Sequence, residues 1–241
     1  MLDFDYKIIK LEDVLSQEEF VNYEKLIHEF DVDLSSVNSS LGFLQWDENV
    51  KEKFIKKHRE QYDDIFIKKY ITYEDFKNLC NLNDEFGFDE KNYFNFFLTC
   101  PFIHIDRIGI TKYFDIAFKK IIENTFNRKI KENLMRTLVG NINIYPKGSF
   151  IKKHQDNDPT NTRLFTSLFF LNHDWDKDYG SILNLYKNDE LIEVIPDYKH
   201  CILIEHPNYN YVHEVTKNIS ELNRYSIYQP FTINDLNEIL E

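Results

Sequence analysis

The chain has 241 residues, with 41 Asp and Glu against 29 Lys and Arg, so its formal net charge is −12. A chain of this length can bury a sizeable core, and we predict a single domain over residues 1–241. Its negative charge would repel a phosphate backbone, and it has no long basic run, which excludes nucleic acid as an expected partner.

The cysteines and the apolar segments indicate where the protein works. Cys80, Cys100 and Cys201 are odd in number and lack paired spacing, so we expect buried free thiols in a reducing compartment. The first residues are acidic where a signal peptide would be basic. The most apolar stretch, residues 94–103, is too short for a membrane helix. We therefore expect a cytoplasmic protein that does not enter a membrane.

The first half of the chain has helical periodicity. The segment 16–30 opens with Ser16 and Glu19, which are spaced as a capping box, and then places apolar residues on one helical face. Residues 47–69 and 112–126 show the same pattern. We predict that about residues 1–130 are mainly helical and support the rest of the domain.

From about residue 135 the pattern changes to short runs of β-branched and aromatic residues separated by turn residues. The predicted strands lie within 136–145, 149–156, 163–172, 181–187, 201–206, 212–217 and 223–233. Such a series indicates a sandwich or a barrel. The fold class that we predict is α+β, with a double-stranded β-helix (jelly roll) core over about residues 131–233 and supporting N-terminal α-helices.

Three residues in this second half have the spacing of a metal site. His154 and Asp156 are two residues apart near the end of a predicted strand, which points both side chains to one face. His213 lies in a later strand that a jelly roll could fold back beside the first. Two histidines and one carboxylate form a facial triad, which is typical of iron(II) oxygenases. The alternative is three polar residues on a solvated sheet face.

The coordination positions that such a triad leaves open suit 2-oxoglutarate, which chelates through its keto oxygen and C1 carboxylate, and O2. The far carboxylate of 2-oxoglutarate then needs a cation on an adjacent strand. Arg224 lies on the next predicted strand, and its guanidinium can bind a carboxylate with two hydrogen bonds. The alternative role for Arg224 is a surface salt bridge.

A second His-x-Asp sequence occurs at residues 104–106. It lies among the predicted helices, after Pro101, and no suitable strand follows it at jelly-roll spacing. We therefore predict a structural role for His104 and Asp106.

Residues of about 140–232 resemble the prolyl 4-hydroxylase-like branch of the iron(II)/2-oxoglutarate-dependent dioxygenase superfamily. The resemblance lies in the strings NIYPKGSFIKKHQDN, RLFTSLFFLNHDWDKDYGSILNLY, HCILIEHPNYNYVHEVT and NRYSIYQPF, in their order and spacing. It implies that Tyr145 lies near the cosubstrate, that Thr166 lines the same pocket, and that Trp175 and Gly180 mark the following turn. Tyr145 and Thr166 could instead be ordinary strand residues, and for Trp175 packing is the expected role.

Two positions depart from the pattern of this family. Phe170 stands where some relatives place a tyrosine hydroxyl on 2-oxoglutarate, and Ser181 replaces the second glycine of a Gly-Gly pair. Related halogenases have a small residue at the position of Asp156, so the carboxylate here implies hydroxylation.

The resemblance implies an enzyme that hydroxylates an aliphatic C–H bond, most simply on a prolyl or other amino-acid residue, and releases succinate and CO2. Its cofactors would be Fe(II), 2-oxoglutarate and O2, with ascorbate as a reductant, and its partner would be a peptide or a small molecule. One alternative is a hydroxylase of free amino acids or natural products with the same site. An alternative of another class is a non-catalytic, cupin-like metal-binding module.

Overall fold

The computed structural model describes residues 6–32, 40–42, 95–102, 105–131, 140–154, 163–187, 190–205, 212–232, 238 and 240. The predicted helix at 47–69, His104, Asp156 and Cys80 lie outside the described residues.

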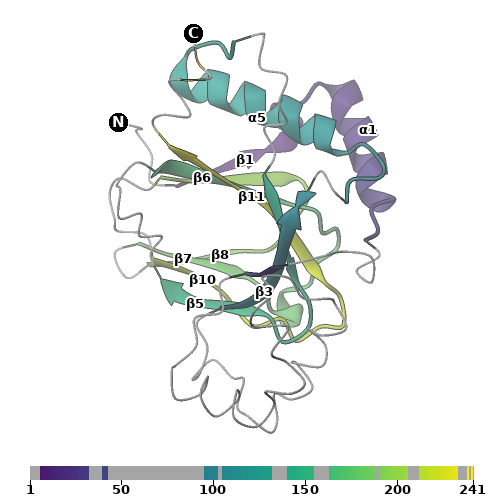
Figure 1. Ribbon diagram of the computed structural model, residues 1–241, viewed down its shortest axis with the longest axis vertical. Coiled ribbons are helices and arrows are strands. Elements are labelled where there is room, and N and C mark those ends of the chain that lie inside the picture. The colour runs from purple at the N-terminus through teal and green to yellow at the C-terminus, as the bar shows by residue number, and fades with distance from the viewer. Residues whose placement is uncertain are drawn as a thin grey trace, which may run out of the picture.

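Strands predominate in the described part of the chain (Figure 1). The strands are β1 (Tyr6–Lys10), β2 (Ser40–Gly42), β3 (Asn95–Pro101), β4 (Asn141–Tyr145), β5 (Phe150–His154), β6 (Arg163–Phe170), β7 (Leu183–Lys187), β8 (Glu190–Val194), β9 (His200–Glu205), β10 (Val212–Val215) and β11 (Arg224–Thr232). The helices are α1 (Gln17–His28) and α5 (Thr111–Phe126), and single 3-10 turns are η1 (Leu11–Asp13) and η4 (Lys177–Tyr179).

The strands form two facing layers that β3 connects. The first layer has the order β1-β9-β6-β11-β4-β3, and the second has the order β5-β10-β7-β8. Every strand pair is antiparallel, and β3 pairs with both β4 and β5. We call these layers the helix-side sheet and the open-side sheet, because α1 and α5 lie along the first one only (Figure 1).

From β4 onward the chain passes repeatedly from one sheet to the other, which is the winding of a double-stranded β-helix. The predicted α+β class with a jelly-roll core and supporting helices is therefore confirmed. All seven predicted core strands are present. The structure adds four strands that the sequence pattern did not predict, namely β1, β2, β3 and β8.

The helices cover the outer face of the helix-side sheet with an aromatic core. Ser16 caps α1, and the capping box with Glu19 is present as predicted. Phe118 of α5 stacks on Phe231 of β11 with 4.7 Å between ring centroids, and Phe165 of β6 stacks on the same ring at 5.2 Å. Each such pair contributes roughly 0.5–1.5 kcal/mol beyond the burial of its apolar area. The first pair joins α5 to the sheet, and the second joins two neighbouring strands of the sheet.

Asp106 has the structural role that its sequence position predicts. Its carboxylate accepts hydrogen bonds from the backbone N–H groups of Gly109, Ile110 and Thr111, at the start of α5. These groups have no partner within the helix, so the carboxylate stabilises its first turn. Cys100 and Cys201 are buried free thiols, also as predicted, and burial raises the pKa of Cys100 to about 11.

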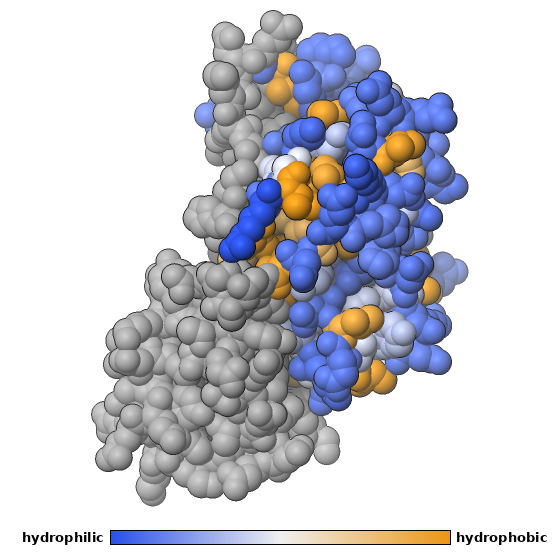
Figure 2. Space-filling model, turned by 90° about the vertical axis from the view of Figure 1, so that its right-hand side faces the viewer, coloured by the Kyte–Doolittle hydropathy of each residue, from blue (hydrophilic) through white to orange (hydrophobic). Residues whose placement is uncertain are grey.

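The described residues on the face in Figure 2 are mainly hydrophilic. Hydrophobic residues on the face in Figure 2 lie in small groups among hydrophilic ones, which is normal for a protein surface. No helix in the described ranges is long and apolar enough to cross a membrane.

The capping box should make the stability of the protein depend on pH. Hydrogen bonds with Lys120 and Ser16 lower the pKa of Glu19 from 4.5 to about 2. Because this pKa is lower in the folded state, the ionised carboxylate stabilises the fold above pH 4.5, and this contribution is lost as the pH falls toward 2. We predict that Glu19→Gln lowers the free energy of unfolding by roughly 0.5–1 kcal/mol at neutral pH.

Urea unfolding of wild type and Glu19→Gln, from neutral pH down to about pH 2, measures the difference in their free energies of unfolding. It should shrink steadily below pH 4.5. The control is Glu18→Gln, which removes an exposed carboxylate from the same helix turn. A difference for Glu19→Gln that stays constant as the pH falls would contradict this account.

Candidate functional site

Two histidines face each other across neighbouring strands of the open-side sheet. His154 is the last residue of β5, and it pairs directly with His213 of β10. Their ring centroids are 4.2 Å apart, and both residues are partly buried. Two imidazoles at this separation can bind one metal ion, as the sequence predicted for these residues.

A register irregularity in this strand pair turns His154 toward His213. His213 and Val215 are two residues apart on β10, but their partners on β5, His154 and Ile151, are three apart. In a regular strand, residues three apart point to opposite faces. The extra residue on β5 has the character of a β-bulge, a feature that often aims side chains next to active sites.

The histidines point into the space between the two sheets. His213 shares a strand face with Val215, and β7 places Leu185 and Leu183 opposite them. Val215, Leu183 and Leu185 pack in one buried cluster with Tyr145 and other residues of the helix-side sheet. The two histidines therefore face the jelly-roll interior, and for them the alternative of a solvated sheet face is wrong.

The ring of His154 is oriented by a backbone contact. Its Nδ1 lies 2.6 Å from the carbonyl oxygen of Lys152. This contact favours the tautomer with the proton on Nδ1, because a carbonyl can only accept a hydrogen bond. Nε2 then keeps its lone pair, as metal-binding histidines require.

Arg224 begins β11 and is almost fully buried, with 1% of its surface exposed. The alternative of a surface salt bridge is therefore wrong. Its guanidinium carbon lies 4.4 Å from the ring centroid of Tyr145 and 5.2 Å from that of Phe170, and Nη1 donates a hydrogen bond to Ser226. The aromatic faces stabilise the cation and hold its plane in one orientation.

The charge on Arg224 has no counter-ion among the described residues. Burial lowers the pKa of Arg224, contact with Tyr145 opposes this, and no acidic residue contributes. The guanidinium remains protonated, since an arginine keeps its proton in any protein environment. Within the described ranges its Nε has no hydrogen-bond partner. A buried cation with an unused donor fits an anionic ligand such as a carboxylate.

Tyr145 and Thr166 lie on the same inner face as Arg224. Tyr145 pairs directly with Arg224 across β4 and β11, and its ring contacts the guanidinium. Thr166 is buried on β6, on the strand face that also carries Leu168 and Phe170. The structure thus places Tyr145 against Arg224, and Thr166 further along the same wall.

The turn that follows β6 is built as the resemblance implies. Trp175 is buried, and its indole N–H donates a 2.9 Å hydrogen bond to the carbonyl of Gly180, which confirms the packing role. Gly180 has φ +71°, and a Cβ there would lie 2.1 Å from the carbonyl oxygen of Lys217. Ser181 also has a positive φ, 55°, in a region that favours glycine. Glycine would adopt the backbone of Ser181 with less strain.

The third predicted metal ligand, Asp156, lies outside the described residues, two positions beyond the end of β5. Within the described ranges, no three His, Cys, Asp or Glu residues come together as a metal site. The two inward-facing histidines nevertheless fit Fe(II), and the buried Arg224 fits the far carboxylate of 2-oxoglutarate.

Three polar residues around Arg224 were not predicted from the sequence: Ser226, Asn172 and Asn218. Ser226 could have been found, because residues two apart on a strand share a face. Asn172 acts through hydrogen bonds to backbone groups about fifty residues away, which no local pattern indicates. Asn218 also makes local contacts with Ser220 and Leu222, but its bond to the carbonyl of Tyr145 spans 73 residues.

Comparison with known protein families finds a match in the jelly-roll part of the chain. The family described as the 2OG-Fe(II) oxygenase superfamily matches residues 140–232. No curated protein sequence matches the chain significantly.

Similar solved structures include prolyl hydroxylases. A Pseudomonas putida prolyl-4-hydroxylase is 16% identical, with a TM-score of 0.44, over 65% of this chain and 83% of that one. A Trichoplax adhaerens prolyl hydroxylase, solved with a hypoxia inducible factor peptide fragment, is 16% identical, with a TM-score of 0.48, over 94% and 98%. The similarity predicted from the sequence is confirmed over residues 140–232, which match the 2OG-Fe(II) oxygenase superfamily.

Proposed function

We propose that this protein is an iron(II)- and 2-oxoglutarate-dependent dioxygenase with His154, Asp156 and His213 as metal ligands. The observation that carries the proposal is the pair of inward-facing histidines, together with a buried Arg224 in the same jelly-roll interior. The match of residues 140–232 to the superfamily supports it.

The residues of the chain have distinct tasks in this proposal. His154 would bind the metal through Nε2 and His213 through a ring nitrogen, and the Lys152 carbonyl keeps the His154 ring in the required tautomer. Arg224 binds the far carboxylate of 2-oxoglutarate, while Tyr145 and Phe170 hold the guanidinium in place. Thr166 contributes to the wall of the same pocket.

The surroundings of Arg224 are apolar. The buried cluster between the sheets contains Tyr145, Phe170, Leu183, Leu185 and Val215. Apolar surroundings strengthen the interaction of a guanidinium with a carboxylate, because screening by water is reduced. When bound, the metal and 2-oxoglutarate activate O2, which oxidises an aliphatic C–H bond to an alcohol as 2-oxoglutarate is converted to succinate and CO2.

We further propose that the substrate is a prolyl or other amino-acid residue in a peptide. The resemblance of the jelly-roll sequence to the prolyl 4-hydroxylase-like branch supports this choice. Release of succinate in the presence of proline-containing peptides tests it. If free amino acids stimulate succinate release and peptides do not, the protein is a small-molecule hydroxylase with the same site.

The first prediction concerns the metal ligands. Anaerobic protein mixed with Fe(II) and 2-oxoglutarate should develop the weak visible charge-transfer band of the chelate complex. His213→Ala should lose the band, because removal of one of three protein ligands breaks the facial triad. The matched control is His200→Ala, which removes a partly exposed histidine at the start of β9 and should keep the band.

The absence of a band in folded, metal-loaded wild-type protein would contradict the proposal. It would favour the non-catalytic metal-binding module.

The second prediction concerns the buried cation. Arg224→Gln should weaken the binding of 2-oxoglutarate by about 100-fold, since hydrogen bonds to charged groups contribute roughly 1.5–3 kcal/mol each. Calorimetric titration of anaerobic, Fe(II)-loaded protein measures the affinity. Arg107→Gln, at an exposed arginine before α5, is the control and should bind normally. Equal affinity in Arg224→Gln and wild type would rule out Arg224 as the carboxylate partner.

A further inference from the structure

Arg224 lies at the beginning of β11, where the regular sheet has almost ended. In the pairing of β11 with β6, the pair nearest the beginning of β11 is Ser226 with Phe170. In the pairing of β11 with β4, it is Arg224 with Tyr145. The backbone just before Arg224 therefore lacks a neighbouring strand on either side, although the side chain must be held accurately.

On the β6 side, the side chain of Asn172 continues the ladder. Its amide nitrogen donates a 2.9 Å hydrogen bond to the carbonyl of Asn223, and its amide oxygen accepts a 2.8 Å bond from the N–H of Tyr225. Asn172 is buried, with 9% of its surface exposed. It therefore binds the backbone groups immediately before and after Arg224, as a paired strand would.

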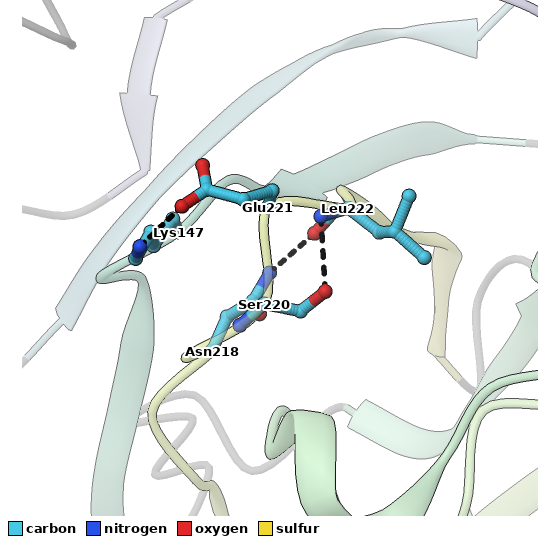
Figure 3. Close-up of polar contacts among 5 residues, drawn as sticks. All are labelled: Lys147, Asn218, Ser220, Glu221 and Leu222. Atoms are coloured by element: carbon cyan, nitrogen blue, oxygen red, sulfur yellow. Dashed lines mark hydrogen bonds and ion pairs between the residues drawn. The ribbon is translucent and has the colours of Figure 1, made fainter.

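On the β4 side, Asn218 has the corresponding role. Its amide nitrogen donates to the carbonyl of Tyr145 at 2.7 Å and to that of Leu222 at 2.8 Å, and its amide oxygen accepts from the N–H of Ser220. The side chain is fully buried, and Figure 3 shows it reaching Leu222. Asn218 thus joins the strand that carries Tyr145 to the loop that leads into Arg224.

The backbone of Asn218 strengthens the same connection. Its N–H donates to the carbonyl of Ser149, and its carbonyl accepts from the N–H of Gly148, both in the turn between β4 and β5. The loop from β10 to β11 is therefore fixed to the turn that joins the strands of Tyr145 and His154.

We propose that Asn172 and Asn218 are positioning residues that hold Arg224 in the geometry needed to bind the far carboxylate of the cosubstrate. The inference rests on the proposed function, since it assigns these asparagines a role in the same site. Neither side chain needs to touch the ligand. Asn172 acts through the backbone of the two residues that flank Arg224, and Asn218 acts through the carbonyls of Tyr145 and Leu222.

The test compares two ligands in Asn172→Ala and Asn218→Ala. One is 2-oxoglutarate, and the other is pyruvate, a 2-oxo acid that lacks the far carboxylate. Calorimetric titration of anaerobic, Fe(II)-loaded protein should show binding of 2-oxoglutarate weakened about tenfold, the usual effect of losing buried hydrogen bonds. The affinity for pyruvate should be unchanged, because it makes no contact with Arg224. Equal losses for both ligands, or no loss for either, would overturn the proposal.

The matched control uses a second link between the same turn and loop. Lys147 and Glu221 form an ion pair there, with side chains 57% and 83% exposed (Figure 3). Such exposed pairs contribute little, so Glu221→Gln should bind both ligands like wild type. If it weakened 2-oxoglutarate binding as much as Asn218→Ala, the buried asparagine would have no special role. Asn172→Ser and Asn218→Ser are milder variants for the case that an alanine variant does not fold.

Amide hydrogen exchange without any ligand gives an independent readout. The variants should exchange faster at residues 224–226 and at the facing β4, but not in β7 and β8. Unchanged protection at 224–226 would overturn the positioning role, whatever the binding data show. If wild-type protein did not bind 2-oxoglutarate, the proposed function would fail, and the exchange data would still decide whether the asparagines hold Arg224.

Discussion

The burial of one positive charge constrains the rest of the site. Arg224 is 1% exposed, and no acidic side chain among the described residues neutralises it. A charge in such surroundings is costly unless aromatic faces, hydrogen bonds and an anionic ligand compensate for it. Tyr145, Phe170 and Ser226 supply part of this compensation. In the proposed function, the far carboxylate of 2-oxoglutarate supplies the rest.

The jelly-roll winding explains how this cation and the two histidines share one interior. From β8 onward, successive strands alternate between the two sheets, so β10 with His213 and β11 with Arg224 lie on opposite walls although they follow each other in sequence. Their inward faces meet in one apolar cluster. The helices cover only the outer face of the sheet that carries Arg224, and they stabilise it without entering the site (Figure 1).

The sequence predicted those features that depend on local periodicity. The capping box at Ser16, helix α5 and the seven core strands follow from spacing within one segment. The order of the strands predicted that the strand of His213 would lie beside that of His154, as it does. The structure agrees with the predicted positions of these two histidines, Arg224 and Tyr145. Binding of metal or cosubstrate by these residues, by Asp156 and by Thr166 stays a prediction.

What the sequence did not predict depends on contacts between distant segments. Strand β1 pairs with β9, and β3 pairs with both β4 and β5. These partners stabilise β1 and β3 as strands, although the sequence patterns of the two segments do not predict strands. The irregular register between β5 and β10 is a property of the pair. The hydrogen bonds of Asn172 and Asn218 likewise join loops to strands, and propensity does not encode them.

The central claim is that one iron ion and one 2-oxoglutarate occupy the interior of this jelly roll. Anaerobic crystals grown with both, measured at the iron absorption edge, test it most directly. The account predicts a single anomalous peak within bonding distance of Nε2 of His154, a ring nitrogen of His213 and the Asp156 carboxylate, with the far carboxylate of 2-oxoglutarate hydrogen-bonded to Arg224. Iron bound elsewhere, or a cosubstrate whose far carboxylate does not reach Arg224, would contradict it.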